Sequence, residues 1–494
     1  MKGRNPFIFS AVMLGACLVL AIGAVAASAE EAEPVWRRPI ELRRSEGQMW
    51  TGDVLLSGSG SLVLVWTAMP TERTKDRLSA MRTSALVSDD RGNSWREFAL
   101  PDEQVRPTAF EIFGDSLCYL AHGQDTMSFY VVDIKTGKGE KHDVFKKADI
   151  EGNEFCPEYS RLLFEGNKIF LVQSTEHPVH YLFTMSTDGG KTWEKPCYVA
   201  KELWQNDSMA PGFFISKDAP NVVYNLSEKQ ELEPHQARTA DKGKTWEDRE
   251  IGFGLEGSFT AHFDTAFIGK DICMSFMGGK LVGGEELAYF STKSTDGGRS
   301  WTKPVKIGTT RAADLCLLYD LKAVDGRLFL TYTRSGKSDL YAQSAHVFMS
   351  KNGGDAWKEL DITQNIARNT GMPVVTADPK TGEVYCVFEN LPPEDEAKEG
   401  GNHFLLFRRA AKPDDPAGAA ANADNVAAMV QVLVSDLDSS DHGTRERATS
   451  DLMALGEEAM APIRKAIEET KSLEAKTRLE RALARYSGEW WKGE

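Results

Sequence analysis

Five octapeptides of one pattern constrain this chain more than any other feature of its sequence. Each has Ser or Thr first, Asp or Asn third, Gly fifth and Trp eighth, and they span Ser88–Trp95, Ser186–Trp193, Thr239–Trp246, Ser294–Trp301 and Ser350–Trp357. The last four begin about 55 residues apart, a period that is typical of a repeat architecture. The first gap is nearly twice as long, which predicts one degenerate copy between the first two.

Each octapeptide lies between two β-rich runs, so we expect it to form a hairpin turn. The third-position side chain then bonds backbone N–H groups, Gly takes a positive φ, and Trp covers the hairpin. Five catalytic copies of one motif make no chemical sense, whereas five turn staples, one per repeat unit, do. The predicted structural residues are Asp90, Trp95, Asp188, Trp193, Asp241, Trp246, Asp296, Trp301, Asn352 and Trp357.

The octapeptides resemble the Asp-box repeat of the sialidase (neuraminidase) superfamily, over roughly residues 36–409. That resemblance implies an all-β propeller of four-stranded blades. Counting strand-like runs gives seven units, whereas sialidases have six blades, and the six-bladed fold is the alternative. Asp133–Gly137 is the predicted degenerate turn of the second unit. The seventh unit lacks a fourth strand, which the run Val35–Leu42 is predicted to supply, closing the ring.

The chain ends differ in composition from the repeats. Lys2 and Arg4 precede an apolar run, and Ala27-Ser28-Ala29 reads as a cleavage site, so residues 1–29 are predicted to be a signal peptide. The mature protein would be secreted or periplasmic; an uncleaved anchor or a lipoprotein attached at Cys17 are the alternatives. The propeller would span 30–409, a linker 410–424, a helical segment resembling a HEAT-type repeat 425–487, and a tail 488–494.

The amino-acid composition limits the classes of ligand and partner that we expect. A formal net charge of −15 argues against nucleic acid, and also against adhesion to anionic membranes once the signal is removed. The seven cysteines show no disulfide framework and no metal pattern, so we expect buried free thiols, no metal and no cofactor. A glycan or glycoconjugate is the expected ligand, and the C-terminal helices are a candidate surface for a protein partner.

The family resemblance also implies a site on the propeller axis. In that site arginines grip a carboxylate bidentately, an Asp is the acid/base, and a neutral Tyr activated by a Glu attacks the sugar. By this resemblance Asp76 is the candidate acid/base and Tyr159 the nucleophile, with Glu158 as its partner. The candidate substrate-binding arginines, at the entries of inner strands or in nearby loops, are Arg73, Arg106, Arg311, Arg334 and Arg368.

Two functions compete at this point. The first is an exported, sialidase-like glycoside hydrolase that removes terminal acidic sugars. The second is a non-catalytic binding or scaffold propeller with a helical interaction tail. The family's Arg-Ile-Pro motif is absent, and Arg38-Pro39-Ile40 is only a scrambled echo of it. Convergence of the candidate side chains around one small ligand would separate the two.

Overall fold

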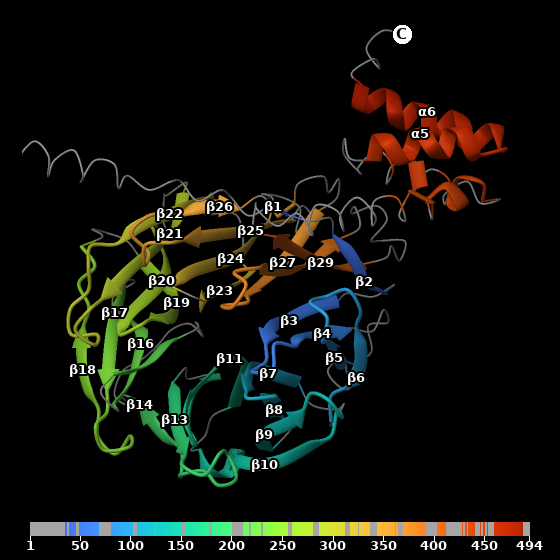
Figure 1. The fold of residues 1–494 in the computed structure, drawn as a ribbon. Helices are drawn as coiled ribbons and strands as arrows, with labels where there is room; N and C mark the ends of the chain where they lie inside the picture. The colour runs from blue at the N-terminus through green and yellow to red at the C-terminus, as the bar shows by residue number, and fades with distance from the viewer. Residues whose placement is uncertain are drawn as a thin grey trace, which may run out of the picture.

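Seven antiparallel sheets form a closed ring around a central axis in this computed structural model (Figure 1). The structure describes residues 35–411 except for loop segments, the longest being 69–80, 200–210 and 392–402, and it describes residues 427–487 in part. Each sheet has four strands in sequence order from the axis outward, apart from the seventh. The count of seven units is therefore confirmed, and the six-bladed alternative is not what forms.

The strands of each blade occupy equivalent positions. The innermost strands are β3 (Met49–Leu56), β7 (Arg106–Phe113), β11 (Glu154–Glu165), β15 (Gly212–Ser216), β19 (Phe259–Ile268), β23 (Leu317–Val324) and β27 (Asn369–Ala377). The second strands are β4 (Leu62–Ala68), β8 (Ser116–His122), β12 (Lys168–Glu176), β16 (Ala219–Glu228), β20 (Asp271–Gly279), β24 (Arg327–Ser335) and β28 (Val384–Leu391).

The outer half of each blade follows the same order. The third strands are β5 (Arg82–Ser88), β9 (Thr126–Asp133), β13 (Tyr181–Ser186), β17 (Glu231–Arg238), β21 (Glu286–Ser294), β25 (Gln343–Ser350) and β29 (His403–Ala411). The fourth strands of blades 1–6 are β6 (Arg96–Ala99), β10 (Gly139–Lys146), β14 (Cys197–Val199), β18 (Glu247–Glu250), β22 (Val305–Arg311) and β26 (Lys358–Leu360). A short 3-10 turn, Lys147–Asp149, follows β10.

The seventh blade is completed by the N-terminal part of the chain, as predicted. Strand β2 (Ile40–Ser45) pairs antiparallel with β29 from Ile40 opposite Phe407 to Ser45 opposite His403. Strand β1 (Val35–Trp36) continues this pairing at Ala410 and Ala411. The ring therefore closes with strands from both ends of the propeller sequence side by side, which covers the edge of β29.

The octapeptides form the hairpin turns between third and fourth strands, and blade 3 shows the geometry. The Ser186 hydroxyl donates to Asp188 Oδ1 at 2.8 Å and accepts the Gly190 N–H at 2.9 Å. Thr192 donates its hydroxyl and its N–H to the Asp188 carboxylate at 2.6 and 2.9 Å. These hydrogen bonds, first that of the Thr192 hydroxyl, lower the pKa of Asp188 to about 2. The hydrogen bonds expected of a turn staple are present at this turn.

The octapeptide Trp does more than cover its own hairpin. Trp193 Nε1 donates to the Gly190 carbonyl at 2.9 Å, while its ring packs edge-on against Phe129 of the preceding blade at 5.6 Å between centroids. The same contact to the preceding blade recurs for Trp95 with Phe407, Trp246 with Phe183 and Trp301 with Phe214. Each of these octapeptides, called a box below, therefore links its blade to the preceding blade as well as closing its own hairpin.

Blade 2 contains the predicted degenerate turn. Asp133 Oδ1 accepts the Thr136 N–H at 2.7 Å and the Thr136 hydroxyl at 2.9 Å, and Gly137 has a φ of 70°. This turn lacks the Trp of the full octapeptide. It retains Asp133 and Gly137, which reverse the chain. The turn therefore forms without the aromatic contact between blades that Trp makes in the full octapeptides.

The C-terminal segment has an apolar core of its own. Helices α5 (Met460–Glu469) and α6 (Leu473–Ser487) share it with earlier residues such as Val430 and Leu452. The resemblance to a HEAT-type repeat stays a prediction. The predicted signal peptide and tail lie outside the described residues. The predicted linker does too, except for its first two residues, Ala410 and Ala411, which end strand β29 and pair with β1. No helix in the described part of the chain combines the length and apolar character needed to cross a membrane.

The cysteines that the structure describes with their side chains are free thiols, as expected. Cys118, Cys273 and Cys386 are buried, and Cys197 is half-buried.

The two glycines of one box provide a matched test of the inter-blade staple. Both have positive φ, 79° at Gly189 and 89° at Gly190, but a Cβ at Gly190 would lie 2.3 Å from the Phe129 ring, whereas one at Gly189 would meet nothing within 4 Å. We expect Gly189→Ala to cost about 1–2 kcal/mol of backbone strain, and Gly190→Ala to cost about 1–3 kcal/mol more through overpacking. Thermal unfolding of the two variants checks this, and equal midpoints would contradict it.

Candidate active site on the propeller axis

A β-bulge interrupts six of the seven inner strands within the described residues. The pairing register with the second strand shifts between Thr51 and Asp53 in β3, and equivalent shifts occur in β7, β11, β19, β23 and β27. Ala109 and His262, inside two of these bulges, have φ values of 51° and 54°. A bulge re-aims the side chains that follow it. Because the inner strands line the axis, the bulges determine which side chains point into the centre of the ring.

Three of these bulges are followed by a carboxylic acid at the equivalent position. Asp53, Glu111 and Asp264 are the first residues to regain strand pairing after the bulges of blades 1, 2 and 5. Asp53 Oδ1 accepts the N–H of Val54 at 2.7 Å, and Asp264 Oδ1 accepts the N–H of Thr265 at 2.8 Å. The repeat thus places acids at one level of the axis from three separate blades.

Two cations join this group, which we call the axial cluster: Asp53, Glu111, Arg161, Asp264, Asp320 and Lys322. The Lys322 ammonium of blade 6 bonds Asp53 Oδ1 of blade 1 and lies 3.3 Å from Asp320. The Arg161 guanidinium of blade 3 lies 3.8 Å from Asp264 of blade 5. The Lys322–Asp53 pair passes blade 7 and the Arg161–Asp264 pair passes blade 4, so these side chains reach across the ring at the axis.

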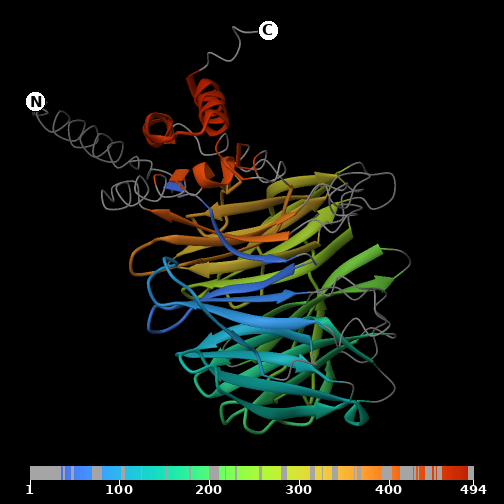
Figure 2. The same ribbon diagram turned by 90° about the vertical axis from the view of Figure 1, so that its right-hand side faces the viewer.

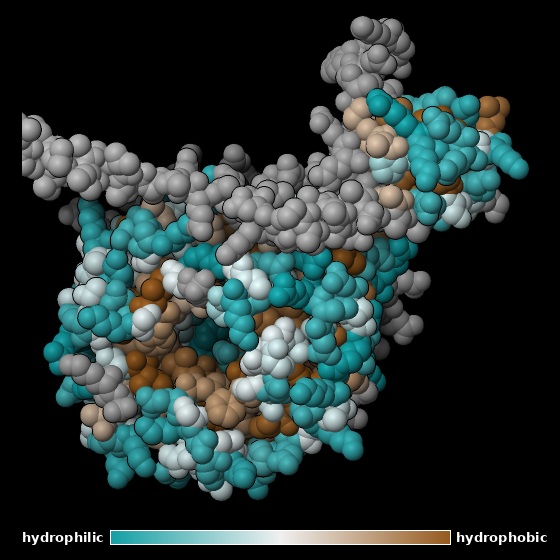
Figure 3. All heavy atoms as spheres, in the orientation of Figure 1, coloured by the Kyte–Doolittle hydropathy of each residue, from teal (hydrophilic) through white to brown (hydrophobic). Residues whose placement is uncertain are grey.

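The axial cluster is enclosed yet not sealed. The side chains of Asp53 and Lys322 keep 16% and 20% of their surface exposed, and Asp264 keeps 10%. In the space-filling view the centre of the ring is a hollow, with hydrophilic surface at its depth and hydrophobic patches on its wall (Figure 3). A small polar ligand that entered this hollow would meet charged groups in a poorly solvated setting, where their fields are strong.

Burial raises the pKa of all three acids, and the cations beside the two aspartates separate their protonation behaviour from that of Glu111. Burial, with a smaller contribution from the Asp53 carboxylate, raises the pKa of Glu111 to about 8. Burial also raises the pKa of Asp53 and of Asp264 to about 6, although Lys322 and Arg161 respectively oppose that rise. At neutral pH Glu111 therefore holds its proton while both aspartates are ionised. Strongly perturbed carboxyls of opposite protonation state are typical of acid/base sites.

Asp53 and Asp264 differ in how many of their carboxylate oxygens are already hydrogen-bonded by described residues. Lys322 and the Val54 N–H both bond Oδ1 of Asp53, and no described residue bonds its Oδ2. In Asp264, Oδ1 takes the Thr265 N–H, while Oδ2 takes the Leu321 N–H at 3.0 Å and faces Arg161. Asp53 thus has an oxygen left for a ligand, whereas Asp264 is engaged on both.

Four of the residues predicted from the sequence have their backbone on the side of the ring where inner strands begin, the entry face. Glu158 and Tyr159 lie on inner strand β11, within its bulge, and Arg106 begins inner strand β7 opposite His122. Arg334 lies near the end of second strand β24, opposite Ser344. The side chains of these four residues are not described. Asp76, Arg73 and Arg368 lie outside the described residues.

Arg311 lies elsewhere than expected. The sequence reading put it at the entry of the sixth inner strand, but it ends β22, the outermost strand of blade 5, opposite Glu286. The reason is that the fourth strand continues in register with β21 to this residue, and β23 begins only at Leu317. Its backbone is therefore three strands from the axis.

The axial cluster itself escaped the sequence reading. Its acids lie within mostly apolar strands. Glu111, for example, has apolar neighbours on both sides in the run Thr108–Phe113 of strand β7. The residues predicted from the sequence lie instead at strand entries or in the loops near them. The available signal was a carboxylic acid in the middle of four inner strands, because such residues are rarely buried without a role.

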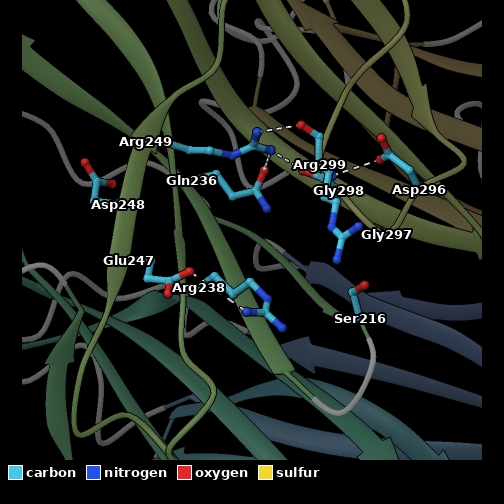
Figure 4. A pocket seen from close by; sticks show the side chains of 10 residues that line it. All are labelled: Ser216, Gln236, Arg238, Glu247, Asp248, Arg249, Asp296, Gly297, Gly298 and Arg299. Carbon is cyan, nitrogen blue, oxygen red and sulfur yellow. Dashed lines mark hydrogen bonds and ion pairs between the residues drawn. The ribbon is translucent and has the colours of Figure 1, made fainter.

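A second cavity lies between blades 4 and 5, near a box turn. It has a volume of about 450 Å³ and is lined by both signs of charge, including Arg238, Arg249 and Asp296 (Figure 4). Arg249 is already engaged, because it donates to Gln236 Oε1 at 2.8 Å and to the carbonyls of Gly298 and Arg299. This guanidinium holds one blade to the next, so the axial cluster is the stronger candidate for chemistry.

No group of three or more His, Cys, Asp or Glu in the described residues is arranged to hold a metal ion. No protein-family model matches the chain, and no curated protein sequence matches it.

Solved structures similar to this chain include the phage phi92 endosialidase, at 11% identity over 77% of this chain and 70% of that one, with a TM-score of 0.42. A Penicillium chrysogenum α-L-arabinanase complexed with arabinobiose is 11% identical over 76% and 98%, with a TM-score of 0.41. The Hadza microbial sialidase Hz136 is 15% identical over 74% and 68%, with a TM-score of 0.38. At this similarity they say nothing about the reaction or the substrate of this chain.

The ion pair across blade 7 supports a stability prediction. Lys322→Met leaves the half-buried Asp53 carboxylate without its cation, so we expect a loss of about 3–5 kcal/mol in unfolding free energy. The double variant Asp53→Asn/Lys322→Met should recover much of that loss. Without Lys322 the folded-state pKa of Asp53 rises further, so the cost should shrink as pH falls and Asp53 takes up a proton. Denaturant unfolding at several pH values measures both effects, and additive single-variant effects would contradict the pairing.

Proposed function

We propose that this chain is an exported glycoside hydrolase whose reaction centre is the axial cluster. The observation that carries this proposal is the pair formed by Glu111 and Asp53. They occupy equivalent bulge positions on neighbouring blades, and one is protonated at neutral pH while the other is ionised. Cleavage of a glycosidic bond needs such a pair, an acid for the leaving oxygen and a carboxylate for the opposite face of the sugar.

Each residue of the pair has a distinct role in this proposal. Glu111, which no described residue hydrogen-bonds, donates its proton to the glycosidic oxygen as the bond breaks. Asp53 uses Oδ2, which no described residue bonds, to take a proton from the water that adds to the anomeric carbon, while Lys322 on Oδ1 keeps the carboxylate ionised and oriented. Arg161 and Asp264 hold the opposite wall of the hollow.

The sialidase-like version of this proposal uses the residues predicted from the sequence. There Tyr159, with Glu158, attacks an acidic sugar, Asp76 is the acid/base, and the arginines bind the substrate carboxylate. Strand β11 carries both Tyr159 and Arg161 of the axial cluster. The two versions differ in substrate: a sialoside for the Tyr mechanism, and an uncharged glycoside for the carboxyl pair.

The second candidate function is a non-catalytic, glycan-binding or scaffold propeller. The observation favouring it is that members of the axial cluster bond across blades, from Lys322 to Asp53 and from the Leu321 N–H to Asp264. Such contacts also hold a ring together. The separate apolar core of the C-terminal helices suits an interaction module in this reading. Export to the periplasm or the medium belongs to both proposals.

Hydrolysis by purified residues 30–494 separates these candidates. A panel of fluorogenic glycosides, sialoside included, should show turnover of at least one member. We expect Glu111→Gln to lower kcat by at least about 100-fold, the typical contribution of a general acid. Asp355→Asn, an exposed ion-pair variant on the box side, is the matched control and should behave as the parent. Turnover lost in Asp76→Ala and retained in Glu111→Gln would instead establish the sialidase-like version.

The pH profile tests the same assignment independently. Activity requires Asp53 ionised and Glu111 protonated, so kcat/KM should rise as pH passes about 6 and fall as it passes about 8. The alkaline limb should disappear in Glu111→Gln. Binding of a glycan without any turnover across the panel would transfer the proposal to the non-catalytic propeller.

A further inference from the structure

Blade 6 carries a second arrangement of reactive groups, away from the axis. Ser344 and His346 lie two residues apart on third strand β25, so both side chains share one face of the sheet. Ser344 Oγ is 2.8 Å from His346 Nε2, and His346 Nδ1 is 2.5 Å from Oε1 of Glu359 on the fourth strand β26. A hydroxyl, an imidazole and a carboxylate are thus linked in a row.

The order of these hydrogen bonds determines where the protons lie. An ionised carboxylate can only accept, so the neutral His346 ring carries its hydrogen on Nδ1 and donates it to Glu359. Nε2 is then a lone-pair acceptor, and the Ser344 hydroxyl must be its donor. Tyr332 stacks on the imidazole, with 4.9 Å between centroids and 13° between planes, and so holds the ring in place. An oriented base beside a hydroxyl is the arrangement that activates a serine.

Blade 4 contains the same arrangement without the serine. His235 lies opposite Tyr224 as His346 lies opposite Tyr332, and Asp248 stands where Glu359 stands in register. His235 Nδ1 is 2.8 Å from Asp248 Oδ2. Two residues before His235 the sequence has Glu233, which has no hydroxyl to activate. The Tyr–His–acid row is therefore a repeated structural device, and blade 6 alone of this pair adds a nucleophile to it.

We propose that Ser344, His346 and Glu359 form a nucleophilic site that accepts the acyl group of a small ester and passes it to water. Ser344 Oγ bonds the carbonyl carbon while its proton goes to His346 Nε2. The ester C–O bond then breaks and the departing alcohol takes that proton. Water, deprotonated by the same nitrogen, releases the acid and restores Ser344. Glu359 stabilises the imidazolium formed in each half.

The site is open to reagents and separate from the axial cluster. Ser344 and His346 are half-buried, with the His346 side chain 19% and that of Glu359 51% exposed. They lie on the third and fourth strands of blade 6, whereas Lys322 of the same blade lies on its innermost strand. The inference therefore does not depend on the proposed glycoside hydrolase activity.

A fluorophosphonate probe, which bonds only activated serines, tests this site in the full mature chain. We expect one label, mapped by mass spectrometry to the peptide that contains Ser344, and slow turnover of p-nitrophenyl acetate. Ser344→Ala should abolish both. Glu359→Gln should slow labelling at least tenfold, because it removes the group that sets the His346 tautomer. His235→Gln, the matched change in blade 4, should leave the labelling rate unchanged.

Two results would overturn the inference. One is a folded wild-type protein whose Ser344 peptide stays unlabelled by the probe. The other is labelling of Ser344 at the same rate in Glu359→Gln as in the parent. A hydroxyl that is merely exposed, and not activated by His346, would react at a rate that does not depend on Glu359. Unchanged thermal midpoints of the three variants confirm that the comparison concerns reactivity rather than folding.

Discussion

Closure of the ring by the N-terminal strands is the constraint on which the rest of this structure depends. Strand β29 would otherwise expose the backbone edge of the seventh blade, and β2 covers it with pairing from Ile40 to Ser45. Blade 7 then stands between blades 1 and 6 at the distance that lets Lys322 bond Asp53. If the closing strand were displaced, the two halves of that ion pair would separate, and the charge balance at the axis would change with it.

The axial cluster shows how a repeat protein makes a site that is not repeated. A register shift recurs in six inner strands, the longest in β11, but only three of them place an acid at the first paired position after it, in blades 1, 2 and 5. Blades 3 and 6 contribute the cations. Similar backbone irregularities therefore present different side chains to one hollow. Their mutual fields, together with burial, push the pKa of Glu111 and that of Asp53 apart. Common architecture supplies the position, and a few side chains supply the chemistry.

The fold was predictable because its hairpin turns depend on residues close together in the sequence. An Asp that bonds the N–H four residues later and a Gly at positive φ need no distant partner, so each box marks its hairpin directly. The closing strand followed from the missing edge partner of the seventh unit. The site was less predictable because its geometry is not local. A bulge exists only relative to the register of a second strand, and Lys322 meets Asp53 across 269 positions of sequence. The search for chemistry at strand entries also misplaced Arg311, since nothing local marks where an outer strand ends.

The protonation state of Glu111 in the resting protein tests the central claim most directly. Isotope-edited infrared titration, with Glu111→Gln subtracted, reports one carboxyl group among many. The account predicts a protonated carboxyl at pH 7 that ionises near pH 8. Ionisation of Glu111 below pH 6, together with Asp53, would contradict it. The axis would then hold a set of ionised carboxylates with no proton to give, and its role would be to hold the ring together.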